Sequence, residues 1–160
     1  MNLKNPYGQL IFISLIALYF AYFVEYVMQI NTCPLCIYQR FPYLLLIFIS
    51  LIAIAGKNYR TYNRLLAVVI IFAIILATYH TGIERGWFEL SSLCKPLITL
   101  AKLNDNISVH DFQKLLYTQN GNLCNQPVLT ILGFSLTQWN LSLNFVLLLF
   151  LYKFGCKTNL

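Results

Sequence analysis

Residues 32–42 read TCPLCIYQRFP and lie between two strongly apolar runs. They place a Cys-x-x-Cys pair, Cys33 and Cys36, four residues ahead of Arg40 at the edge of an apolar segment. A two-residue gap closes almost no loop, so a disulfide there stabilises the fold little, and its short ring opens and re-forms easily. The stretch therefore predicts a redox-active pair at the mouth of a membrane segment, and such a pair needs partners elsewhere in the chain.

The composition predicts a membrane protein. The chain has 160 residues, of which 59% are hydrophobic and 10% charged, with a mean hydropathy of +0.66. A soluble domain is about half apolar and about a quarter charged, so this chain has too few charges to cover a globular surface. The net charge of +6 is spread singly between apolar runs, which indicates membrane topology and argues against a nucleic-acid-binding protein.

Four apolar runs predict four membrane-spanning helices, because a span needs about 20 residues. The first run is too long for the core of a signal peptide and is followed by no small-residue cleavage pattern. We therefore expect an all-α membrane protein, a four-helix transmembrane bundle that forms a single domain over residues 1–160. The expected spans cover about residues 10–29, 37–56, 65–83 and 136–154.

The basic residues predict the orientation of these spans, because positive residues collect in cytoplasmic loops. The loops at about residues 30–41 and 84–137 should then face outward, and both termini should be cytoplasmic. The cytoplasmic side would carry six basic residues and no acidic one: Lys4, Lys57, Arg60, Arg64, Lys153 and Lys157. The outward side would carry five basic residues offset by four acidic ones: Arg40, Arg85, Lys95, Lys102 and Lys114 against Glu84, Glu89, Asp105 and Asp111.

This topology divides the five cysteines between two compartments. Cys33, Cys36, Cys94 and Cys124 fall on the oxidising side and Cys156 on the reducing side. Four cysteines allow three connectivities, and the short spacing makes Cys33–Cys36 the natural local pair, with Cys94–Cys124 as the other. Taken alone, the wider pair is better interpreted as a structural staple, which would stabilise the fold by about 3–4 kcal/mol. It lacks the spacing of a zinc ribbon, so no metal site is expected.

The chemistry around the short pair favours a reactive cysteine. If a helix begins at Pro34 or the next residue, its free backbone N–H groups would stabilise a thiolate. Arg40 follows Cys36 by one helical turn and could stabilise an anion there, although it could also be an interfacial anchor. Pro42 should either kink this helix or mark its start.

Two other ionisable residues lie near the outer ends of the predicted spans. His80 is a candidate for function because ionisable groups at this depth are costly, although a hydrogen-bonded structural histidine is the common alternative. Glu25 is interpreted as a snorkelling interfacial carboxylate. Two amphipathic stretches, at about residues 93–100 and 109–116, predict short interfacial helices in the second outer loop.

The motifs CPLCIYQR, YHTGIERGW…C and C…P…LGFSLTQWN together resemble the DsbB family of the bacterial inner membrane, which reoxidises the periplasmic thiol oxidase DsbA. The resemblance implies a quinone-dependent protein-disulfide oxidoreductase. Cys94 would form the mixed disulfide with a DsbA-like partner, and Cys124 would complete the wider pair. Cys33 and Cys36 would receive the electrons, with Cys36 as the thiolate that faces the quinone.

The same resemblance implies a quinone-binding role for Arg40 and His80. The cofactor would be ubiquinone or menaquinone, and no family role falls on Cys156. Two alternatives remain: a non-catalytic four-span protein with two structural disulfides, or a DsbB-like paralogue dedicated to one substrate. A vitamin K epoxide reductase-like enzyme would share the four-helix arrangement, but the order of the two cysteine pairs along the chain favours DsbB. The oligomeric state stays open.

Overall fold

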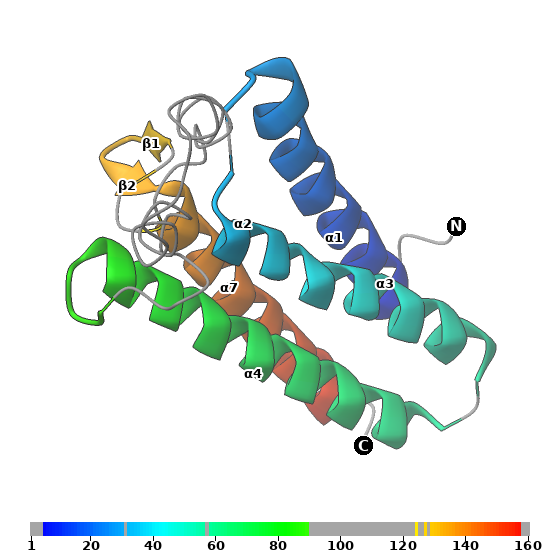
Figure 1. The fold of residues 1–160 in the computed structure, drawn as a ribbon. Coiled ribbons are helices and arrows are strands. Elements are labelled where there is room, and N and C mark those ends of the chain that lie inside the picture. Colours follow the sequence, from blue (N-terminus) through cyan, green and yellow to red (C-terminus); the bar gives the residue numbers. More distant parts are fainter. Residues whose placement is uncertain are drawn as a thin grey trace, which may run out of the picture.

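The computed structural model describes residues 5–30, 32–56, 58–89, 124, 127 and 129–157. The described chain is mostly helical, and its long helices pack beside one another (Figure 1). The helical elements are α1 (Pro6–Tyr22), the π-helix η1 (Phe23–Val27), α2 (Pro34–Tyr38), α3 (Arg40–Ala55), α4 (Tyr59–Glu84) and α7 (Leu136–Lys157). A short hairpin, β1 (Thr130–Ile131) and β2 (Phe134–Ser135), precedes α7.

Three helical segments of the described chain are long and apolar enough to cross a membrane: Pro6–Val27, Pro34–Ala55 and Tyr59–Glu84. This confirms the prediction of an all-α membrane protein. All three segments begin a few residues before the predicted spans, because hydropathy marks only the apolar part of a helix that continues into the interface. α7 begins at the predicted residue, but its first half is rich in polar side chains, so a fourth crossing remains a prediction.

The helices share one core. Leu10, Leu46, Leu66 and Leu147 come from α1, α3, α4 and α7 respectively, and all four are fully buried in a single cluster. Small buried residues, among them Ser14, Ser50, Ala53 and Ala77, let the helices approach closely, as is typical of helix contacts in membranes. The outward faces of the helices carry exposed large apolar side chains, as lipid-facing surfaces do, for example Phe48, Ile75 and Leu149.

The helical conformation is interrupted between α2 and α3 at one residue, Gln39. α3 then begins at Arg40, so Pro42 lies in its first turn, where a missing N–H breaks no helical hydrogen bond. Of the two possibilities for Pro42, the structure therefore has a helix start rather than a kink. Arg40 and Cys36 lie on opposite sides of this one-residue turn.

The hairpin before α7 positions the start of that helix. Leu132 and Gly133 both have positive φ, at 55° and 82°, as a two-residue type I′ turn requires. Ser135 and Gln138 form a reciprocal capping box: each backbone N–H donates to the other side chain, at 3.2 and 3.4 Å. Glu84, at the end of α4, accepts a hydrogen bond from the Ser135 hydroxyl at 2.7 Å and so joins the two helix ends.

The two amphipathic stretches that predict interfacial helices lie outside the described residues. Cys94 and the side chain of Cys156 lie outside them as well.

Candidate functional site

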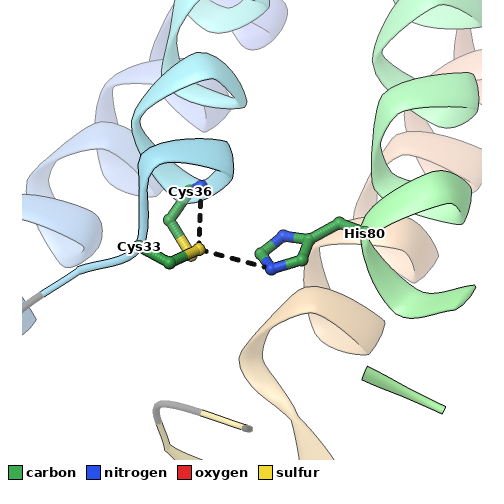
Figure 2. A group of neighbouring side chains, drawn as sticks. All are labelled: Cys33, Cys36 and His80. Carbon is green, nitrogen blue, oxygen red and sulfur yellow. Dashed lines mark hydrogen bonds between the residues drawn. The ribbon is translucent and has the colours of Figure 1, made fainter. Parts of the chain in front are cut away.

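Cys33 and Cys36 lie at the start of α2, and their side chains are in contact (Figure 2). Cys33 is the N-cap of α2, and Pro34 occupies the first helical position, as the sequence predicts. Both cysteines are free thiols, and their Sγ atoms are hydrogen-bonded at 3.1 Å. The backbone N–H of Cys36 donates to Cys33 Sγ at 3.3 Å. The turn therefore stabilises a negative charge on Cys33.

His80 reaches the same sulfur from α4. Its Nε2 lies 3.4 Å from Cys33 Sγ, and the imidazole is buried (Figure 2). Its other nitrogen, Nδ1, has no hydrogen-bond partner in the part of the chain that the structure describes. Because the cysteine contact is its one described polar contact, His80 is placed to act on Cys33.

These contacts lower the pKa of the Cys33 thiol below its ordinary range. The hydrogen bond with the Cys36 side chain is the largest cause, and burial opposes it by raising the pKa. His80 lowers the pKa further through its hydrogen bond and its charge, and the Cys36 backbone N–H adds to this effect. The thiolate of the reduced pair is therefore favoured on Cys33, whereas the resemblance assigned the thiolate to Cys36.

Cys124 packs against the short pair. It is buried and disulfide-bonded, and it belongs to one buried cluster with Cys33, Leu35 and Ile83. Its partner is neither Cys33 nor Cys36, since both of these are free thiols. The pairing of Cys124 with Cys94 stays a prediction. What the structure adds is that a cysteine from the far end of the long loop belongs to the same buried cluster as Cys33.

A cavity of about 290 Å³ opens on the other side of the pair, between α1, the α2–α3 junction and α7. Cys36 and Arg40 both line it, but His80 is not among its lining residues. The two predicted quinone-binding residues are thus separated, with Arg40 on the cavity and His80 beside Cys33. The rest of the lining is mainly apolar and includes Ala17, Leu18, Val24, Trp139 and Leu143.

The Arg40 side chain is held from η1 and the end of α1. Its guanidinium forms an ion pair with Glu25 and lies over the Tyr22 ring, 4.8 Å from the ring centroid. Only 11% of the Arg40 side chain and 25% of the Glu25 side chain are exposed. Glu25 was interpreted as a snorkelling carboxylate, and the structure corrects this, because Glu25 is the counter-ion of Arg40. The sequence did contain a signal for this ion pair, because Glu25 and Arg40 carry opposite charges and both lie near the outer ends of predicted spans.

Sequence reasoning also missed a set of neutral polar residues on the cavity wall. Gln39, Tyr43 and Asn140 line the cavity and are linked by hydrogen bonds between the α2–α3 junction and α7. Their signal is present in the motifs CIYQR and QWN, where amides stand within otherwise apolar helices.

The short pair also brings together three potential metal ligands. The ligand atoms of Cys33, Cys36 and His80 all lie within 4.8 Å of one another. Thiolate and imidazole are the donors that zinc and other thiophilic cations prefer. The same arrangement is also that of a reduced dithiol with a basic neighbour, and the adjoining apolar cavity and the nearby disulfide-bonded Cys124 favour redox chemistry.

Comparison with known proteins agrees with this site. A family model described as disulfide bond formation protein DsbB matches residues 5–154. The uncharacterized protein RP370 of Rickettsia prowazekii is 41% identical over 143 residues, which are 89% of this chain and 81% of that protein. Disulfide bond formation protein B of Acinetobacter baumannii is 29% identical over 89% of this chain and 84% of its own length.

A further relative is disulfide bond formation protein B 1 of Pseudomonas putida, which is 30% identical over 87% of this chain and 81% of its own length. No solved structure matches the chain. The family match extends from the start of α1 almost to the end of α7 and includes the cysteines that meet at the site. The chain therefore belongs to the DsbB family of disulfide bond formation proteins.

Proposed function

We propose that this protein reoxidises a periplasmic DsbA-like dithiol oxidase and passes the electrons through its two cysteine pairs to a membrane quinone. One observation carries the proposal: the two sulfurs of the short pair have different neighbours. Cys33 is buried in one cluster with Cys124, against which Cys36 also packs, whereas Cys36, and not Cys33, lines an apolar cavity together with Arg40. A pair placed in this way can take electrons on one side and deliver them on the other.

The first half of the reaction transfers electrons to the wider pair. A thiolate of the reduced partner attacks Cys94, the Cys94–Cys124 disulfide opens, and a mixed disulfide forms. The second thiol of the partner then attacks its own mixed-disulfide sulfur and releases Cys94. The partner leaves oxidised, and Cys94 and Cys124 hold two electrons and two protons as thiols.

The second half moves those electrons to the short pair. The Cys124 thiolate attacks Cys33 of an oxidised Cys33–Cys36 disulfide, and Cys36 is released as the leaving thiolate. Cys94 then attacks Cys124, which re-forms the wider disulfide and releases Cys33. The arrangement of free Cys33 and Cys36 thiols in one cluster with a disulfide-bonded Cys124 corresponds to the end of this half-reaction.

The cavity fits a quinone ring. Its volume of about 290 Å³ is at the lower end of ligand pockets, its walls are mainly apolar, and it opens among helices that face lipid. A bound quinone, whether ubiquinone or menaquinone, supplies an acceptor for two electrons and two protons. Cys36 would lie against it, Arg40 would stabilise negative charge that develops there, and Cys33 and Cys36 would close to the disulfide as they give up two electrons and two protons to the acceptor.

His80 would act on Cys33 and not directly on the quinone. It is placed to stabilise the Cys33 thiolate when the wider disulfide re-forms, and to hold a proton that the dithiol releases on oxidation. The inner membrane would hold the protein with the two cysteine pairs on the periplasmic side, where DsbA-like proteins occur.

A trapping experiment tests this function. In a Cys124→Ser variant, Cys94 is left as a free thiol that can attack the disulfide of the oxidised partner and release that partner's second thiol, so we expect a mixed disulfide with a DsbA-like protein, captured by acid quenching and alkylation and found by mass spectrometry. The wild-type chain should also reduce a short-chain ubiquinone when it is supplied with that reduced partner, and Cys36→Ser should not. No mixed disulfide, together with no quinone reduction by the wild type, would contradict the proposal. Capture of one dedicated substrate instead would indicate a specialised paralogue.

A further inference from the structure

Gln39 has an unpaired amide beside the cavity. The residue forms the turn between α2 and α3, lines the cavity and is only 7% exposed. Its side-chain Nε2 is buried and has no hydrogen-bond partner in the described part of the chain. Buried amide N–H groups are rarely left unpaired in native proteins, since losing water without replacement costs free energy. Because Gln39 lines the cavity, a ligand bound there would be within reach of this residue and could supply the missing acceptor.

The hydrogen bonds among Gln39, Asn140 and Asn144 determine which atom of the Gln39 amide, the oxygen or the nitrogen, lacks a partner among the described residues. Asn144 Nδ2 donates to the backbone carbonyl of Asn140 at 2.9 Å, and a carbonyl can only accept, so the orientation of the Asn144 amide is determined. The same Nδ2 donates to Asn140 Oδ1 at 3.3 Å. The Asn140 oxygen must therefore face Asn144, which directs Asn140 Nδ2 the other way.

Asn140 Nδ2 donates to Gln39 Oε1 at 3.1 Å. The Tyr43 hydroxyl donates to Asn140 Oδ1 and so supports the same orientation. The Gln39 oxygen is thus occupied, and its nitrogen is left as a free donor. Reversing this amide would place two N–H groups against each other, so the donor is preorganised.

We propose that Gln39 Nε2–H is the neutral hydrogen-bond donor of the quinone site and binds a carbonyl oxygen of the quinone. This inference rests on the proposed function and adds a residue to it. A carbonyl accepts from an amide N–H without taking its proton, so Gln39 binds and orients the ring while the thiols supply the protons. Its hydrogen bond strengthens as negative charge develops on that oxygen.

A binding experiment tests the role of Gln39 without turnover. Trp139 lines the cavity, and a bound quinone should quench its fluorescence. A Trp87→Phe background removes the other tryptophan, and the oxidised protein prevents electron transfer. We expect Gln39→Met to raise the Kd of a short-chain ubiquinone about tenfold, as for the loss of one hydrogen bond. Ser50→Ala, a buried change elsewhere on α3, is the matched control and should leave the Kd unchanged.

Two further arms separate hydrogen bonding from packing. A matching alkylbenzene without carbonyl oxygens should compete for the cavity equally well in wild type and Gln39→Met. Gln39→Glu keeps the shape and the acceptor for Asn140 but has no donor when ionised, so it should raise the Kd for quinone at neutral pH as well. If Gln39→Met does not fold, the Kd of the Gln39→Glu variant tests whether Gln39 is the donor.

The outcomes are distinct. Wild-type affinity for quinone in both Gln39 variants overturns the role of Gln39 and leaves the proposed function intact. Equal loss of quinone and alkylbenzene binding makes Gln39 a packing residue and also overturns its role as a donor. Absence of quinone binding by the wild type overturns the proposed function and this inference together.

Discussion

At the scale of single residues, the feature that matters most is the difference between two cysteines that are three positions apart. Cys33, as N-cap, points its sulfur back at the first N–H groups of α2 and toward His80. Cys36, one turn later, lines the cavity that Arg40 also lines. The short helix therefore separates a sulfur with stabilised negative charge from a sulfur that can meet an oxidant.

Replacing His80 by Phe should raise the pKa of the Cys33 thiol, because the phenyl ring keeps the volume but removes the hydrogen bond and charge of the imidazole. We expect a rise of about one unit, the size that a single strong contact typically gives. Ultraviolet absorbance of the thiolate, followed as a function of pH in the reduced protein, measures this pKa. Cys33→Ser is the control and should remove the low-pKa transition, leaving only the remaining thiols. An unchanged titration in His80→Phe would contradict the role assigned to the histidine.

The same thiol makes the stability of the reduced protein depend on pH. A pKa lowered on folding means that the unfolded chain holds the proton more tightly, so the free energy of unfolding rises with pH between the folded and unfolded values. The contribution is complete above the unfolded pKa of about 8.5 and is lost as the pH falls through the folded pKa. Thermal unfolding of reduced wild type in detergent should show this slope, and Cys33→Ser should show less of it.

Replacing Arg40 by Ala should raise the KM for a short-chain quinone by about tenfold, because the cavity loses the cation that stabilises developing charge. Thiol exchange between the partner and the Cys94–Cys124 pair should keep its rate, since Arg40 lies on the other side of the short pair. Steady-state quinone reduction and a separate exchange assay distinguish the two steps. Arg64→Ala, an exposed arginine near the start of α4, is the control. An unchanged KM would remove Arg40 from the quinone site.

At the scale of elements, the sequence predicts the helices well and their ends less well. Long apolar runs define α1, α3 and α4, and Pro34 correctly predicts the start of α2. The π-helix at Phe23–Val27 and the hairpin before α7 were not predicted. Both depend on tertiary contacts: η1 carries Glu25 toward Arg40, and the hairpin brings Ser135 to Glu84. A single sequence contains no periodic signal for such contacts.

Replacing Glu25 by Gln should destabilise the packing of η1 against α3, because Arg40 would be left without its counter-ion. The expected loss is about 1–3 kcal/mol in the free energy of unfolding, between the values for surface pairs and fully buried pairs. Thermal unfolding in detergent measures it. The double variant Glu25→Gln with Arg40→Ala should recover part of the loss, since no uncompensated charge remains. Equal stability of the single variant and wild type would show that the pair contributes nothing.

At the scale of the whole molecule, the site is formed by segments that are far apart in the sequence. The sequence identifies the chemical groups, because cysteines, an arginine and a histidine are conspicuous in an apolar chain. It does not show that His80 contacts Cys33 while Arg40 lines the cavity with Cys36, nor that Gln39 and Asn140 are hydrogen-bonded on the cavity wall. These facts depend on how α3 packs against α1 and α4, and α4 against α7, which hydropathy does not encode.

The orientation in the membrane decides whether the proposed electron route can operate. α4 has 26 residues and is therefore about 39 Å long, more than the roughly 30 Å of a bilayer core, so its two ends lie on opposite sides if it spans. His80 lies one turn from the C-terminal end of α4 and contacts Cys33, so the short pair lies at that end. The charge pattern predicts that this end faces the periplasm.

Reporter cysteines at the two ends of α4 test this orientation. Trp87→Cys, just beyond the C-terminal end, and Asn58→Cys, just before the N-terminal end, both replace exposed residues. In spheroplasts, a membrane-impermeant maleimide should label Trp87→Cys at once and Asn58→Cys only after lysis, with the unsubstituted chain as baseline. The reverse pattern would place Cys33 and Cys36 on the reducing side, where a DsbA-like partner could not reach the relay that feeds them.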